Sequence, residues 1–311
     1  MRTSSFRAWY RPRKILIVSD ISEHPARTLE AITMFQRAGA RLFLVPLQKP
    51  SYGVGIAGHG LSHLAFNDKK TGEPPLENAC QPVLWDKTLS ETTVLNSARL
   101  LQVPELAESV GADIVILVAP DSGLTQLNTI PFEIGLLGSL DVPILIFGKH
   151  TDLSSWKHNN FSRILLPATF GPGLLYRLRF ACRMACRYHA RLTVLHVFES
   201  HMSTESHWER TPVAVEGKLP MSQLRREGIL CPMEITVCEG YPEQAILRFS
   251  ELRRHDLIIM GRPRQDILRG QFGHSAVHGV IADAHCPVLI LGSTIETACT
   301  SIESVSQLAF A

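Results

Sequence analysis

The sequence predicts an α/β protein built from two tandem, doubly wound, Rossmann-like domains with parallel sheets. Short apolar runs of the first half recur in the same order in the second half, which is the signature of a repeated folding unit. Each run is continuously apolar and rich in β-branched residues, as in strands that are buried on both faces of a parallel sheet. A stretch with helical periodicity follows the first run of each half.

The repeated runs predict four strands in each half. The matched segments are residues 13–20 and 162–169, 39–47 and 189–197, 111–120 and 254–263, and 142–148 and 286–292.

A helix is expected between the first two strands of each half, over residues 22–40 and 171–190. The second stretch places one apolar stripe on a single helical face, made of Leu174, Leu178, Ala181, Met184 and Ala185. A strand, a helix and a strand at this spacing form a βαβ unit with a right-handed crossover.

The domain boundaries follow from the same repeat. The first domain is predicted at residues 13–148 and the second at residues 161–293, joined by the polar stretch Lys149–Asn160. A segment rich in glycine and proline, residues 48–81, has no counterpart in the second half and is expected to be a loop.

Composition excludes several classes of protein. The chain has 311 residues and a formal net charge of +2, which gives no electrostatic footprint for nucleic acid. No apolar run approaches the roughly 20 residues of a membrane helix, and the basic start lacks a secretory core. Seven scattered cysteines without C-x-x-C spacing favour reduced thiols and a cytoplasmic location.

Five segments of the second half together resemble the universal stress protein family. They read "RILLPATF", "ARLTVLHVFE", "CEGYPEQAIL", "HDLIIMGR" and "CPVLILG", and the first half repeats part of this order. The resemblance to a tandem member implies a five-stranded, adenine nucleotide alpha hydrolase-like sheet in each domain. It also implies an intramolecular pseudo-dimer, whose pseudo-twofold contact is made by the last, edge strands. Whether two chains form a homodimer stays open.

Many members of this family bind ATP through a glycine-rich loop after the fourth strand, where backbone N–H groups and a helix N-terminus hold the phosphates. The family pattern is Gly, two residues, Gly, nine residues, Gly, and then Ser or Thr. In the second half these positions fall on Gly261, Arg264, His274 and Ser275, with Gly273 beside the third. Two of the three glycines are therefore replaced.

The rest of the family's nucleotide site is divided between the two halves. Pro167 and Val197 match family site residues, but Thr169 stands where the family has the acid that receives the nucleoside. The first half keeps that acid as Asp20 and has Ala119 in place of the first glycine. Neither copy is complete.

Two functions remain open at this point. The first is a stress-response interaction scaffold that is not an enzyme, has degenerate nucleotide sites and binds protein partners. The alternative is a regulatory module that binds ATP, AMP or a related adenine nucleotide in one cleft, through Asp20 or through Gly261 and Ser275. No catalytic triad, nucleophile elbow or paired carboxylates are recognisable, and no metal is expected.

Three competing motifs are interpreted as structural. The G-x-G-x-x-G within residues 53–60 follows the second strand, whereas a dinucleotide fingerprint follows the first. Cys182, Cys186 and His189 are expected to lie on one helix and to belong to the core, since ligands on one short face converge poorly on a metal. His201 and His207 are expected in a polar loop.

Overall fold

The computed structural model describes residues 12–19, 28, 30–32, 40–46, 92–94, 102–118, 140, 142–151, 161–170, 173–199, 208–210, 217–262 and 276–292. The elements described in the first half are β1 (Lys14–Ser19), β2 (Arg41–Pro46), β3 (Thr92–Val94), α3 (Val103–Val110), β4 (Ile114–Val118) and β5 (Ile144–Phe147). Those described in the second half are β6 (Arg163–Pro167), α5 (Leu174–Tyr188), β7 (Arg191–Glu199), β8 (Trp208–Arg210), α7 (Met221–Arg226), β9 (Met233–Gly240), α8 (Pro242–Leu252), β10 (Leu257–Gly261), α9 (Ala276–Asp283) and β11 (Val288–Leu291).

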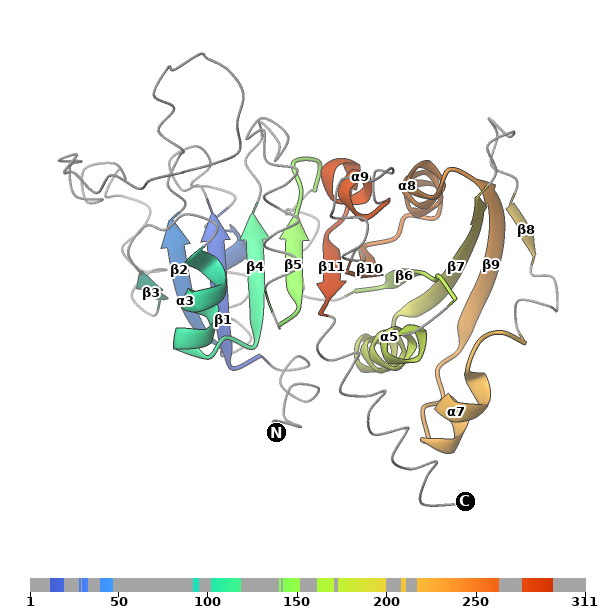
Figure 1. Cartoon of the computed structure of the whole chain (residues 1–311), viewed down its shortest axis with the longest axis horizontal. Helices are drawn as coiled ribbons and strands as arrows, with labels where there is room; N and C mark the ends of the chain where they lie inside the picture. Colours follow the sequence, from blue (N-terminus) through green and yellow to red (C-terminus); the bar gives the residue numbers. More distant parts are fainter. Residues whose placement is uncertain are drawn as a thin grey trace, which may run out of the picture.

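The strands form one hydrogen-bonded sheet in the order β3-β2-β1-β4-β5-β11-β10-β6-β7-β9-β8 (Figure 1). Within each half the first strand lies in the middle, and the chain winds outward from it in both directions. All pairs are parallel except β5 with β11 and β8 with β9. The predicted doubly wound α/β fold is therefore confirmed.

The two halves meet through their last strands. β5 and β11 run antiparallel, with Leu145 opposite Leu289 at the centre of the pair. An antiparallel pair has a local twofold axis, and the strand order runs outward from it in the same way on both sides. This is the edge-strand contact that the sequence analysis expects.

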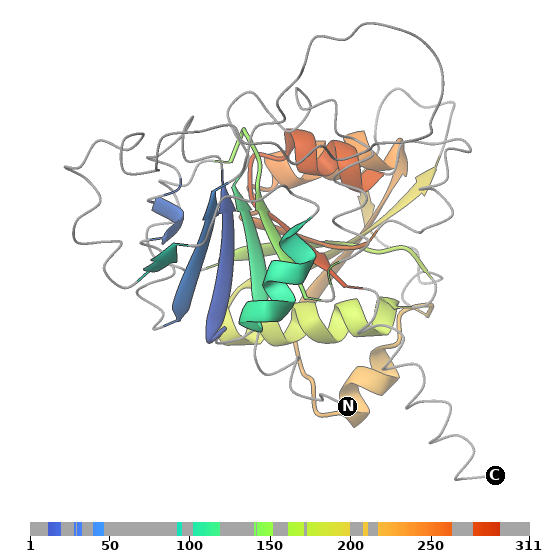
Figure 2. The same ribbon diagram turned by 60° about the vertical axis from the view of Figure 1, so that its left-hand side comes forward.

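Both faces of the sheet are buried, as the continuous apolar runs require. Along β1, Ile15 and Ile17 belong to one core cluster and Leu16 and Val18 to the other. In the second half, α5 covers one face while α8 and α9 lie side by side on the other (Figures 1 and 2). The predicted stripe of α5 is buried throughout.

All eight predicted strands are present, and the helix predicted over residues 171–190 is α5. The helix predicted over residues 22–40 is described only at Thr28 and Glu30–Ile32, which are helical. The loop at residues 48–81, His201, His207 and the tail after Gly292 lie outside the described residues. The repeat did not place the strands β3, β8 and β9 or the helices α3, α7 and α8, although the resemblance implied a fifth strand in each domain.

Candidate functional site

The first candidate site is the carboxyl edge of the second-half sheet. The chain leaves β6 toward β7 on one side, and β10 lies on the other side of β6. The gap between the ends of β6 and β10 is therefore a topological switch point, where open α/β sheets bind their ligands. Leu165 of β6 pairs with Ile258 of β10, so both strands end at this edge.

Four of the predicted site residues are described, and three of them end up at this switch point. Pro167 is the last residue of β6, Thr169 follows it and is exposed, and Gly261 is the last residue of β10. Val197 lies on β7 and is half-buried. The other predicted site residues, Asp20, Arg264, Gly273 and Ser275, lie outside the described residues.

Sequence reasoning missed the side chain that occupies this edge, Arg177 of α5. Arg177 is only 7% exposed, although it carries a guanidinium group. Its Nη2 donates a hydrogen bond to the carbonyl oxygen of Thr169 at 3.5 Å. A Cβ atom added at Gly261 would lie 2.7 Å from Nη1 and 3.2 Å from Cδ of the same side chain. Arg177 therefore spans the switch point from the end of β6 to the end of β10.

Gly261 also has a neighbour that the sequence analysis did not predict. In an ATP loop, the missing side chain at this position lets the backbone approach phosphate. Here the missing side chain leaves room for the guanidinium of Arg177. The sequence did hold a signal for this, because Arg177 lies three residues after Leu174 and four before Ala181, on the buried face of α5.

An aromatic group flanks the same edge. His196 of β7 packs against Phe170 in a tilted arrangement, with the ring centroids 4.3 Å apart and the planes inclined by 49°, and its Nδ1 lies 2.8 Å from the carbonyl oxygen of Ala168. On the other side His196 meets the ring of Phe198 edge-on at 4.6 Å. The Nζ atom of Lys218 lies 5.4 Å above the ring of Phe170. These rings border the exposed Thr169.

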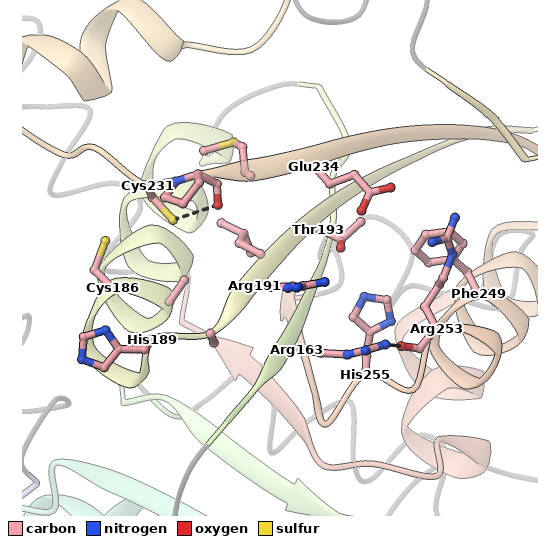
Figure 3. A pocket seen from close by; sticks show the side chains of 15 residues that line it. Arg163, Cys186, His189, Arg191, Thr193, Cys231, Glu234, Phe249, Arg253 and His255 are labelled. Carbon is pink, nitrogen blue, oxygen red and sulfur yellow. Dashed lines mark hydrogen bonds between the residues drawn. The ribbon is translucent and has the colours of Figure 1, made fainter.

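The second candidate site is a cavity of about 730 Å³ at the opposite, amino edge of the same sheet (Figure 3). Its lining comes from the C-terminal part of α5, the starts of β6, β7 and β9, and the end of α8. Three arginines line it, Arg163, Arg191 and Arg253, against one acid, Glu234. No sequence motif pointed to this cavity, because its walls come from segments far apart in the chain.

His255 lies in the wall of this cavity and is almost completely buried. Its ring stacks on Phe249, with centroids 5.5 Å apart and planes inclined by 27°. The pKa of His255 is lowered to about 4, chiefly by burial and also by the charges of Arg163, His285 and Arg253, against a backbone hydrogen bond that raises it. The imidazole is therefore neutral at pH 7.

The prediction that Cys182, Cys186 and His189 form one core face of a helix is correct for one residue of the three. Cys182 is fully buried, but Cys186 is exposed and lines the cavity. His189 is exposed and lies beyond the last turn of α5, where it takes a left-handed φ of 54° as the C-cap. α5 ends at Tyr188, so His189 lies outside the helix that was predicted to carry it.

No group of three or more His, Cys, Asp or Glu side chains among the described residues is placed to hold a metal ion. Within the same residues, no helix is both long enough and apolar enough to cross a membrane.

The comparison with protein families matches the half that carries both candidate sites. Residues 160–292 match the universal stress protein family. A universal stress protein of Methanocaldococcus jannaschii is 25% identical over 141 residues, which are 43% of this chain and 83% of that protein.

Solved structures extend the likeness of fold beyond residues 160–292. A universal stress protein of Archaeoglobus fulgidus, at 18% identity, gives a TM-score of 0.58 over 91% of this chain and 97% of its own. A functionally unknown protein of Pseudomonas aeruginosa, at 14% identity, gives 0.56 over 96% of this chain and 99% of its own. At these identities the match concerns the fold alone, and it covers both halves.

Proposed function

We propose that this chain is a tandem universal stress protein that acts as a non-catalytic interaction scaffold in a stress response. Support for two domains comes from the strand order, which is repeated on both sides of the β5–β11 pair, and from structural neighbours that span both halves. We place it in the cytoplasm, since all five described cysteines are free thiols.

Arg177 is the observation that carries the proposal of a scaffold. An adenine nucleotide bound at the switch point would need the space beside Gly261 and Thr169, and the guanidinium occupies that space at 7% exposure. A ligand would have to displace a buried cation from a hydrogen bond and a packed surface, both of which cost free energy. We therefore expect the second-half cleft to bind no nucleotide.

The alternative function is regulation by ATP or AMP, and one observation favours it. The rings of Phe170 and His196 pack against each other next to the exposed Thr169, and such rings offer a face for a purine base. In this alternative the base would rest on those rings and the phosphates would pair with a displaced Arg177. A nucleotide bound in the first half, beside Asp20, is the other form of the same alternative.

Calorimetry with ATP and with AMP separates these functions. The purified chain is first denatured, and mass spectrometry is used to search for released nucleotide. We expect none from the native protein and no heat of binding up to about millimolar nucleotide, that is, a binding free energy weaker than about 4 kcal/mol. Incubation with ATP should yield no ADP.

A variant of Arg177 tests whether this side chain keeps nucleotide out of the second-half cleft. Arg177→Ala opens the space beside Gly261 and should give measurable nucleotide binding. Arg179→Ala is the matched control, because Arg179 lies on the same helix but pairs with Glu227 away from the edge. If the native chain binds nucleotide, and if this binding persists in Asp20→Ala but is lost in Arg177→Ala, the alternative function holds, with the nucleotide in the second half. Binding lost only in Asp20→Ala would place a nucleotide in the first half.

A further inference from the structure

Three cysteines gather where α5 ends beside the segment that enters β9. Cys182 and Cys186 are four residues apart on α5 and therefore share one helix face. Cys231 comes two residues before β9, its Sγ lies 3.6 Å from the carbonyl oxygen of Pro232, and its thiol interacts electrostatically with the thiols of both helix cysteines. The Sγ of Cys186 also lies 3.5 Å from the carbonyl oxygen of Leu230, the residue before Cys231.

The three thiols differ in their access to solvent. Cys182 is fully buried, whereas Cys231 is partly exposed and Cys186 is exposed. Cys186 and Cys231 both line the amino-edge cavity, and Figure 3 shows their side chains on the α5 side of it. A small molecule that enters this cavity reaches these two sulfurs and not Cys182.

The interactions between the three thiols also make them chemically unequal. Interaction with the Cys182 thiol lowers the pKa of Cys231, and the Cys186 thiol acts in the same direction against the effect of burial. The pKa of Cys182 is raised by its interaction with Cys231 and by burial, and the pKa of Cys186 is raised chiefly by burial. The thiolate is the reactive form of cysteine, so Cys231 is the first of the three to react.

We propose that Cys231 and Cys186 form a reversible thiol–disulfide site that reacts with low-molecular-weight disulfides. The Cys231 thiolate attacks one sulfur of the disulfide RSSR, forms a mixed disulfide and releases RS⁻. Cys186 then attacks the Sγ of Cys231, which forms the Cys186–Cys231 bond and expels a second RS⁻. The two protein thiols are oxidised, RSSR is reduced to two RSH, and the protons lost by the two cysteines end on the two leaving groups.

The charge of the cavity selects the kind of disulfide. Arg163, Arg191 and Arg253 outnumber the single acid Glu234, so an anionic disulfide is concentrated near the thiols and a cationic one is not. Oxidised glutathione has this charge and is the probe for the test.

Peptide mapping after exposure to oxidised glutathione tests the site. The native chain is incubated with the probe, quenched in acid, alkylated, digested and analysed by mass spectrometry. We expect a Cys186–Cys231 cross-link, a stable glutathione adduct on Cys231 in Cys186→Ser, and neither product in Cys231→Ser. In the reduced native chain, iodoacetamide should modify Cys231 at least about tenfold faster than a buried thiol.

The chain supplies its own internal references. Cys238 and Cys286 are buried, and burial raises the pKa of Cys238 to about 11 and that of Cys286 further. Both should stay free of glutathione until urea unfolds the protein, and the unfolded sample also shows that the probe is active. If Cys186 and Cys231 stay as unreactive as these two in the native chain, the proposal is wrong. A Cys182–Cys231 cross-link, or equal glutathione uptake in Cys231→Ser, would likewise overturn it.

Discussion

The two edges of the second-half sheet differ in how they are filled. At the carboxyl edge, where doubly wound folds bind ligands, the buried Arg177 spans the ends of β6 and β10. At the amino edge of the same strands there is a cavity of about 730 Å³ lined by arginines and thiols. The strands of the sheet are the same at both edges, and single side chains decide how much space each edge leaves. Likeness of fold alone would therefore direct attention to the edge that Arg177 spans.

The largest effect is expected at the wall of the amino-edge cavity. Phe249 is 2% exposed and packs between the core and the ring of His255, so Phe249→Ala removes a large buried ring. We expect a loss of about 3–5 kcal/mol in the free energy of unfolding, measured by urea denaturation. Leu252→Ala on the same helix is the control, because Leu252 is 62% exposed and should change stability by less than about 0.5 kcal/mol. Equal costs for the two variants would mean that this wall is not part of the core.

The next effect is a pH dependence that originates at the amino edge. The pKa of His255 falls from 6.5 to about 4 on folding, so between these values the unfolded chain binds more protons than the folded one. Stability is therefore lost as the pH falls below about 6.5, by about 3 kcal/mol at pH 4. Urea unfolding at several pH values measures this loss.

His255→Gln isolates the histidine contribution. Burial raises the pKa of the neighbouring Asp256, which acts in the opposite direction because stabilisation by a raised pKa is lost as the pH rises. The variant keeps Asp256 and removes only the imidazole, so its curve should be flatter than that of the native chain between pH 4 and pH 6.5. Superimposable curves would mean that folding does not lower the pKa of His255.

The elements that the sequence predicted well are those that local pattern determines. The strands were recognisable because burial on both faces requires continuous apolar runs, and the ends of parallel strands placed Pro167 and Gly261 at one edge. Arg177 was missed because the apolar stripe of α5 was taken as the whole buried face, although a charged residue lay within it. The amino-edge cavity was not predictable, since Cys186, Thr193, Glu234 and His255 meet only in the folded chain.

The smallest effect compares two glycines that follow or end strands at the carboxyl side, Gly148 after β5 and Gly261 in β10. A Cβ atom at Gly148 would lie 2.9 Å from the backbone carbonyl oxygen of Ile281 in α9, whereas one at Gly261 would meet only the flexible end of Arg177. We therefore expect Gly148→Ala to cost about 1–3 kcal/mol, because a helix backbone must shift. Gly261→Ala should cost less than about 1 kcal/mol, because a side chain can move aside. Urea denaturation of the two variants measures this difference. A larger cost at Gly261 would show that Arg177 is held rigidly at the switch point, more firmly than its contacts suggest.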